Sequence, residues 1–169
     1  ISCVPDPMRM AKASGRGFTL IEMMVVVAVI AVLALLMVPA YIDRLVRNQI
    51  SEALPLADIA KRPIQTSWSQ AQVLPADNES IGLPVAEKVV SNYVRAVTVE
   101  GGAIHMAFGN RAHRQISGQR LTLRPAIVTD APVVPIAWVC GYASVPGNMT
   151  IQGENRTSIP AGYLPTQCR

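Results

Sequence analysis

A long uncharged segment near the N-terminus constrains this chain more than any other feature. The sequence has no charged residue from Met23 to Ile42, a stretch of 20 residues that is almost entirely apolar. As an α-helix with a rise of about 1.5 Å per residue it would be about 30 Å long, which matches the hydrocarbon core of a bilayer. A single carboxylate, Glu22, directly precedes it. The segment therefore predicts a membrane-spanning helix with one acidic residue at its start.

Two simpler interpretations account for only part of this segment. A secretory signal peptide has an apolar core of about 7–15 residues followed by a small-residue cleavage site, whereas this apolar run is longer and Gly17 stands before it. A plain single-span anchor fits the length and the flanks but gives no role to the sequence Gly17-Phe18-Thr19-Leu20-Ile21-Glu22. An ionised acid at a helix centre costs about 2.5–3.5 kcal/mol on membrane-insertion scales, so this carboxylate requires a partner.

The sequence from Gly17 to Val26, GFTLIEMMVV, closely resembles the class III signal of type IV prepilins and related pseudopilins. The resemblance implies that a prepilin peptidase cuts between Gly17 and Phe18 on the cytoplasmic side and that Phe18 is then N-methylated. It also implies a role in assembly for Glu22, and it places Pro39 where many type IV pilins carry proline. We hypothesise that Glu22 pairs with the Phe18 ammonium group of an adjacent subunit and so sets the axial register.

The residues before Phe18 are expected to form a leader, residues 1–17, that is removed. The chain opens with Ile, and we expect translation to begin at Met8 or Met10. Basic residues of the leader favour a cytoplasmic N-terminus, so the precursor is expected in the bacterial inner membrane. Residues 18–42 would then form the transmembrane and polymerisation helix, and residues 43–169 a periplasmic or extracellular head domain of a size that suits one core.

The cysteines indicate a disulfide in the exported part. Cys140 and Cys168 are the two cysteines that follow the leader, and an even pair in an oxidising compartment favours a disulfide. It would contribute about 3–4 kcal/mol in the chain-entropy model. The cysteines and the two histidines show no recognisable zinc-ligand spacing, and neither a metal nor a cofactor is expected. The C-terminal sequence from Tyr163 onward also resembles that of type IV pilins, in which such a pair closes a loop.

The rest of the chain predicts an α+β head. Apolar residues recur at helical spacing after the span, which predicts one long helix from Phe18 to near Gln70. Three prolines should bend or loosen this helix, and a break at the last of them is left open: Pro39, Pro55 and Pro63. The functional hypothesis for Pro39 is that the helix melts there when the subunit leaves the membrane.

Four strands are expected after a surface connection over residues 71–92. They cover residues 93–100, 103–108, 120–124 and 135–140, and Gly101-Gly102 predicts a hairpin turn between the first two. The predicted fold is therefore α+β: a long N-terminal α-helix, first membrane-spanning and then amphipathic, packed on a roughly four-stranded antiparallel sheet, with a C-terminal disulfide loop.

No motif in the sequence supports catalysis, since G-x-S-x-G, P-loop and H-E-x-x-H patterns are all missing. We expect His105 in a strand and His113 in a loop rather than as an acid–base pair. The interval 101–129 contains no acid and carries four arginines that could contact an anionic partner such as nucleic acid, although such clusters are more often a solvated surface. These are Arg111, Arg114, Arg120 and Arg124.

The resemblance and these features together indicate a structural subunit of a type IV pilus. It would form a homopolymer through its N-terminal helix, with the pilus assembly machinery, and the extracellular filament would serve adhesion or twitching motility. One alternative is a minor pilin with a DNA-binding or DNA-uptake role. Another is a type II secretion pseudopilin, but major pseudopilins usually lack the cysteine pair and often hold calcium, and the last 30 residues here contain one acid, Glu154.

Overall fold

The computed structural model describes residues 17–169, which fall into two compact units. The first unit extends to Val38 and the second runs from Pro39 to Arg169. The expected translation start at Met8 or Met10 and the leader before Gly17 lie outside the described residues. Helix α1, Leu20–Ala53, contains Pro39.

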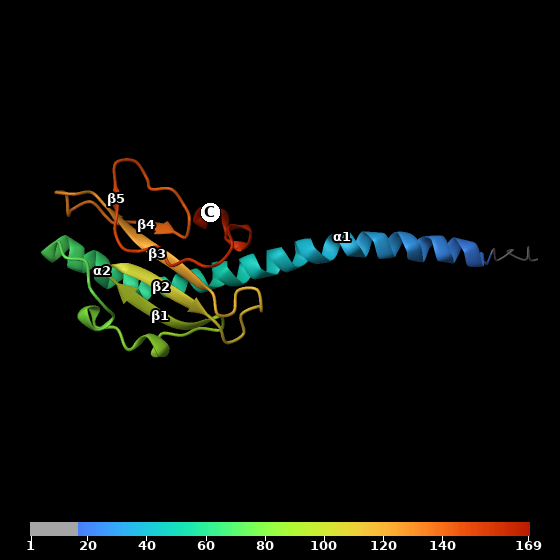
Figure 1. Ribbon diagram of the computed structural model, residues 1–169, viewed down its shortest axis with the longest axis horizontal. Coiled ribbons are helices and arrows are strands. Elements are labelled where there is room, and N and C mark those ends of the chain that lie inside the picture. The colour runs from blue at the N-terminus through green and yellow to red at the C-terminus, as the bar shows by residue number, and fades with distance from the viewer. Residues whose placement is uncertain (1–16) are drawn as a thin grey trace, which may run out of the picture. The chain divides into compact units, whose positions relative to one another are not determined.

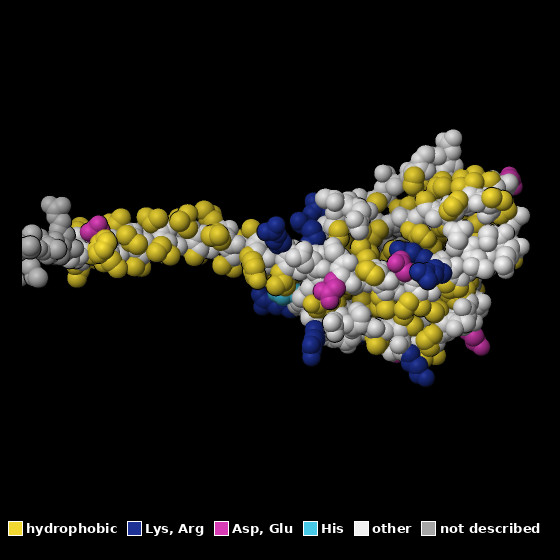
Figure 2. Space-filling model, turned by 180° about the vertical axis from the view of Figure 1, so that it is seen from behind, with side chains coloured by type: hydrophobic (Ala, Val, Ile, Leu, Met, Phe, Trp, Pro, Cys, Tyr) yellow, Lys and Arg dark blue, Asp and Glu magenta, His cyan; other side chains and the backbone are white. Residues whose placement is uncertain are grey.

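In the first unit, α1 is apolar around its whole circumference. Every side chain from Phe18 to Val38 is exposed, and the helical region is long and apolar enough to cross a membrane. Figure 2 shows apolar side chains along this helix and one acidic side chain near its start. A helix that is apolar on every side is typical of a membrane span or of a segment that other helices cover.

In the second unit, the helical region presents an apolar stripe to the head. A 3-10 turn, Leu54–Ala57, joins α1 to helix α2, Asp58–Ala71, and Pro55 lies in this turn. The stripe follows helical spacing through all three elements, and most of its side chains are buried completely, at about 1.5–3 kcal/mol for each large one. Its members are Val46, Ile50, Ala53, Ala57, Ala60, Ile64 and Trp68.

The break considered at Pro63 does not occur, because α2 continues through this residue to Ala71. A proline at this position removes the hydrogen bond to the carbonyl of Ile59. Ile59 is exposed, whereas Ile64 and Trp68 pack into the core on the other side of the helix. The departure from α-helical geometry falls at Pro55 instead.

Five strands form one antiparallel sheet (Figure 1). They are β1, Val94–Glu100; β2, Ala103–Phe108; β3, Arg120–Ile127; β4, Ala137–Cys140; and β5, Thr150–Ile151. Their order is β1-β2-β3-β4, and β5 pairs with β3. Gly101 and Gly102 form the β1–β2 turn with φ values of 55° and 82°, a conformation that glycine adopts without strain. The predicted hairpin is thus confirmed.

Three details of the sheet differ from the prediction. Strand β3 continues three residues beyond residue 124, through Pro125. Its pairing with β2 ends at Leu123, so the missing N–H of Pro125 removes no hydrogen bond to β2. Strand β4 begins later than expected, because the N–H of Ile136 donates to Gln65 Oε1 at 2.7 Å rather than to a strand. Strand β5 is only two residues long, too short to produce a periodic pattern.

The two faces of the sheet have different surroundings. Ile104, Met106 and Phe108 alternate along β2 and form the core together with the helical stripe. His105 lies between them in sequence and therefore on the opposite face, which we call the outer face. The predicted α+β architecture, with the long helix packed on an antiparallel sheet, is confirmed.

Candidate functional site

The residues predicted to be cleaved and assembled lie at the start of α1. Gly17 and Phe18 are exposed and precede the helix. Thr19 caps the helix, because its Oγ1 accepts a hydrogen bond from the Glu22 N–H at 3.3 Å. The spacing of Thr19 and Glu22 is that of a capping box, a signal that the sequence analysis missed. The Glu22 carboxylate is exposed at the positive end of the helix dipole, and no ion pair engages it within residues 17–169.

Pro39 lies inside α1, and its neighbours are exposed. In the single subunit the helix is formed on both sides of this residue. The hypothesis that the helix melts here during assembly concerns the filament and stays a prediction.

Cys140 and Cys168 form the expected disulfide. Cys140 ends β4, and Cys168 lies in a 3-10 turn at the C-terminus, Thr166–Cys168. The chain turns directly after the bond, since Gly141 has a φ of 58° and the N–H of Tyr142 donates to the Cys168 carbonyl at 3.0 Å. A Cβ at Gly141 would lie 2.6 Å from that carbonyl oxygen, so only glycine fits here.

The loop that the disulfide closes passes along β3 and onto the outer face. Thr157 Oγ1 accepts a hydrogen bond from the Thr122 N–H at 3.1 Å, and Ser158 exchanges hydrogen bonds of 2.9 and 3.0 Å with the backbone of Arg120. Residues 156–158 thus occupy the position beside β3 that β4 takes further along the strand. This path brings Arg156 onto the outer face.

A cavity of about 400 Å³ lies on the outer face of the sheet. Small residues of β1 and β2, Ala96 and Ala107, leave room for it. Its ionisable lining residues come from the α2–β1 connection, from β1, β2 and β3, and from the C-terminal loop: Glu87, Arg95, Glu100, His105, Arg120 and Arg156.

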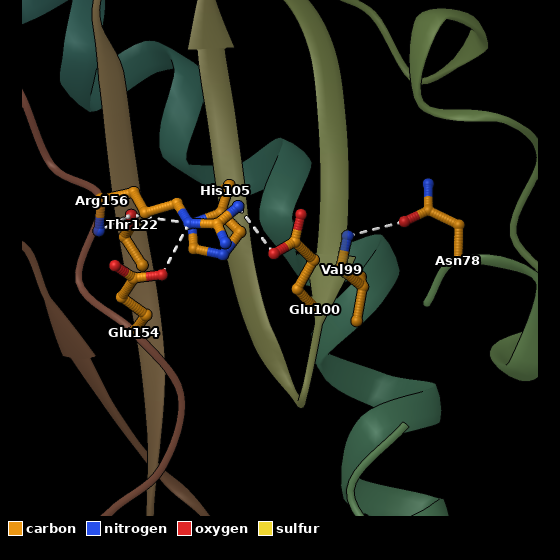
Figure 3. Close-up of polar contacts among 7 residues, drawn as sticks. All are labelled: Asn78, Val99, Glu100, His105, Thr122, Glu154 and Arg156. Carbon is orange, nitrogen blue, oxygen red and sulfur yellow. Dashed lines mark hydrogen bonds and ion pairs between the residues drawn. The ribbon is translucent and has the colours of Figure 1, made fainter. Parts of the chain in front are cut away.

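Arg156 is engaged by two carboxylates at this cavity (Figure 3). Its Nη1 lies 2.6 Å from Glu100 Oε2 and its Nε 3.0 Å from Glu154 Oε2. The hydrogen bonds with Glu154 and Glu100 raise the pKa of Arg156 above its ordinary value. Arg156 therefore anchors the C-terminal loop to the end of β1.

His105 forms the buried floor of the cavity. Its Nδ1 lies 2.9 Å from Thr122 Oγ1, and that hydroxyl already accepts the N–H of Arg156 at 3.1 Å (Figure 3). Burial lowers the pKa of His105 below its ordinary value, against the opposing effect of Glu100.

The four arginines predicted to face an anionic partner are spread over the head. Arg111 and Arg114 are exposed in the β2–β3 connection, whereas Arg124 is half-buried in β3. Arg120 lies four residues before Arg124, about 13 Å away at the usual strand rise, and lines the cavity. The expected contact with nucleic acid stays a prediction.

Two arginines that the sequence analysis did not single out line the cavity with Arg120, namely Arg95 and Arg156. Arg95 belongs to the predicted first strand, and a charged residue near the start of that strand is a signal that could have indicated a binding residue. Arg156 carries no such signal, because its position depends on the path of the C-terminal loop. Within residues 17–169, no group of three or more His, Cys, Asp or Glu is arranged to hold a metal ion.

The chain matches two family models: pilin (bacterial filament) over residues 46–169, and the prokaryotic N-terminal methylation motif over residues 12–38. It is 32% identical over 160 residues to the type IV major pilin protein PilE of Neisseria gonorrhoeae, covering 91% of this chain and 93% of that one. It is also 31% identical over 165 residues to the fimbrial protein EcpC of Eikenella corrodens, covering 95% and 94%. These matches confirm the predicted resemblance, and the chain therefore belongs to the pilin family of bacterial filament subunits, a family of structural proteins and not of enzymes.

Proposed function

We propose that this chain is the subunit of a type IV pilus that polymerises through its N-terminal helix. The observation that carries the proposal is the exposed apolar surface of α1 between Phe18 and Tyr41. The second unit has a buried core of its own, so this surface is not needed to fold the head. An apolar surface of this extent requires lipid or protein around it, and a subunit that moves from membrane to filament meets both in turn.

Processing before Phe18 is part of the same proposal. The methylation motif covers Gly17 and Phe18, which supports cleavage between them by a prepilin peptidase and methylation of the new N-terminus. Both residues are exposed and lie ahead of the first helical turn, so a peptidase could reach the bond without unwinding α1.

The assembly step joins the exposed helices of neighbouring subunits. Van der Waals packing supplies most of the attraction between helices that leave lipid, because lipid is as apolar as the helix surface. The Glu22 carboxylate then needs a cation in apolar surroundings, and the Phe18 ammonium group of an adjacent subunit is the partner that we propose. This pairing would fix the axial register of the polymer.

The proposal also assigns locations to the parts of the chain. Residues 1–17 are the removed leader, residues 18–42 anchor the precursor in the inner membrane with its N-terminus in the cytoplasm, and residues 43–169 form the head outside. The assembled filament is extracellular. Relatives that are named major pilins or fimbrial proteins favour a major subunit, and adhesion or twitching motility would be properties of the fibre and its assembly machinery.

Mass spectrometry of filaments sheared from cells tests the proposal. The most abundant protein should begin with N-methylated Phe18. A Gly17→Leu variant should keep its leader and yield no filaments, whereas the matched change Gly162→Ala, at an exposed position with open space around it, should assemble normally. A wild-type chain that keeps the residues before Phe18 and stays monomeric in cells with a working pilus machine would show the proposal to be wrong.

A further inference from the structure

We propose that the outer-face cavity binds a small anionic sugar, meaning a monosaccharide that carries one carboxylate or one phosphate. Arg95 and Arg120 would hold the anionic group, and the acidic side chains of the lining would accept hydrogen bonds from the sugar hydroxyls. The inference concerns the folded head alone and goes beyond the assembly of the subunit.

The first argument is that two arginines of the cavity have no ion-pair partner in residues 17–169. The third, Arg156, is paired with Glu100 and Glu154. Arg95 and Arg120 line the same cavity and form no ion pair with any residue in the described part of the chain. Guanidinium groups present forked N–H donors that match the oxygens of carboxylate and phosphate groups. Two such groups at one cavity suit a single anion between them.

The second argument is that an irregularity in the backbone of β1 directs Arg95 toward the cavity. Val94 pairs with Phe108 and Ala96 with Ala107, so Arg95 is the extra residue of a β-bulge in β1. Bulges redirect a side chain out of the regular alternation. The aliphatic stem of Arg95 lies across Gly109, where a Cβ would come within 2.9 Å of the Arg95 Cδ. The position is therefore shaped by a bulge on one strand and by a missing side chain beside it.

Arg120 is fixed by different contacts. Its backbone N–H donates to Ser158 Oγ at 2.9 Å, and its carbonyl accepts the N–H of Ser158 at 3.0 Å. The C-terminal disulfide loop thus holds the first residue of β3 in place. The two arginines approach the cavity from separate elements, β1 and β3, with β2 between them.

The floor of the cavity adds a further polar group. Thr122 engages Nδ1 of His105, and no hydrogen bond to Nε2 is formed within the described residues, so Nε2 is available to a ligand. The lining also contains acceptors that an inorganic anion would not use, the carboxylates of Glu87 and Glu100 and the hydroxyl of Thr98. Donors for an anion and acceptors for hydroxyls together describe a sugar acid or a sugar phosphate. The cavity volume of about 400 Å³ lies at the small end of ligand sites, which span about 300–1,000 Å³.

Binding should be coupled to protonation of His105. A bound anion favours the charged imidazolium, so the affinity for glucuronate, whose carboxylate keeps its charge in this range, should rise as the pH is lowered from 8 to 6. The other charged groups that face this cavity and His105 are Glu87, Arg95, Glu100, Arg120, Glu154 and Arg156.

Calorimetric titration of the full chain in detergent tests the inference. Glucose 6-phosphate and glucuronate are the anionic probes, and glucose and inorganic phosphate are the controls. Either anionic sugar should bind, with glucose at least tenfold weaker. Arg95→Gln and Arg120→Gln should each weaken binding at least tenfold, whereas Arg62→Gln, at an exposed arginine of α2, should leave it unchanged. Gly109→Ala should also weaken binding, although it alters no charge.

Three results would overturn the inference. The first is no binding of either anionic sugar at 10 mM, and the second is equal binding by the Arg95→Gln/Arg120→Gln double variant with an unchanged circular dichroism spectrum. The third is binding of inorganic phosphate as tight as that of glucose 6-phosphate, which would reduce the cavity to a simple anion site. None of these results bears on filament formation, so a failure here leaves the proposed function standing.

Discussion

Asn78 takes the place of a neighbouring strand along the outer edge of β1. The N–H of Val99 donates to Asn78 Oδ1 at 2.6 Å, and Asn78 Nδ2 donates to the carbonyls of Val97 and Pro84 at 2.9 and 3.1 Å (Figure 3 shows the bond to Val99). Asn78 lies in the irregular connection between α2 and β1 and is buried. One side chain therefore fastens this connection to the edge of the sheet, where unpaired backbone groups would otherwise remain.

Replacing Asn78 should destabilise the head. Asn78→Ala leaves the buried N–H of Val99 without an acceptor, and such a group costs about 1–3 kcal/mol. Denaturant unfolding of the full chain in detergent, followed by tryptophan fluorescence, measures the loss. Asn148→Ala is the matched control, because Asn148 is exposed. Equal stabilities of the two variants would show that the side-chain bridge contributes nothing.

Two glycines with similar backbone angles should respond differently to alanine. Gly141 and Gly147 have φ values of 58° and 50°, so alanine at either position should cost about 1–2 kcal/mol for the left-handed conformation. Only Gly141 faces an obstacle, the carbonyl oxygen of Cys168 at 2.6 Å from the new Cβ, whereas Gly147 has open space. Gly141→Ala should therefore lower the free energy of unfolding clearly more than Gly147→Ala, and a reversed order would contradict the close approach.

Loss of the disulfide should destabilise the head by about 3–4 kcal/mol, the amount that the chain-entropy model assigns to a loop of this length. Cys140 and Cys168 are separated by 28 positions. The double change Cys140→Ser/Cys168→Ser removes the crosslink, and denaturant unfolding measures the effect. Dithiothreitol should destabilise the wild type to a similar extent and leave the double variant unaffected. A reductant effect on both proteins would point to another cause.

His105 should make the head less stable in mild acid. Its pKa is lowered in the folded state, chiefly by burial, so below its ordinary value of 6.5 the unfolded chain binds more protons than the folded one. This contribution is complete above pH 6.5 and is lost as the pH falls toward the folded pKa. Unfolding measured between pH 8 and pH 5 should show the decline in the wild type and in His113→Gln. The decline should be smaller in His105→Gln.

The charge of Glu22 and its place in the capping box can be separated by mutation. Glu22→Gln keeps a residue that suits the third position of a capping box but removes the charge, so we expect few or no filaments. Thr19→Ala removes the Oγ1 cap, at about 1 kcal/mol, and retains the charge, so assembly should persist. Sheared filament yield, compared at equal precursor levels in the membrane, decides between the two roles. Normal yield from Glu22→Gln would rule out the pairing with Phe18.

Elements defined by periodic patterns were predictable from the sequence. The buried stripe from Val46 to Trp68 follows helical spacing. The β1–β2 hairpin is indicated by two glycines between segments in which apolar and polar residues alternate. The disulfide followed from having two cysteines in the part expected outside the cell. Each of these conclusions depends on neighbours in the sequence or on the number of residues of one type, which a sequence shows directly.

Features that depend on distant partners were not predictable. The length of β3 is set by where β2 stops, and the start of β4 by a hydrogen bond from Ile136 to Gln65. The cavity combines Arg95, which a bulge redirects, with Arg156, which the C-terminal loop brings over the sheet. No sequence pattern near either arginine indicates the other. The site can therefore be recognised only when the pairing of the strands and the path of the C-terminal loop are known.

The exposed apolar surface from Phe18 to Tyr41 restricts how a filament could come apart. Transferring so many large apolar side chains into water would cost on the order of tens of kcal/mol, so a subunit should not escape from a fibre into the surrounding medium. The lipid bilayer is the other environment that accepts this surface. Shortening should therefore proceed from the membrane-embedded end, with each released subunit returning to a pool in the bilayer, while a detached fibre should persist intact.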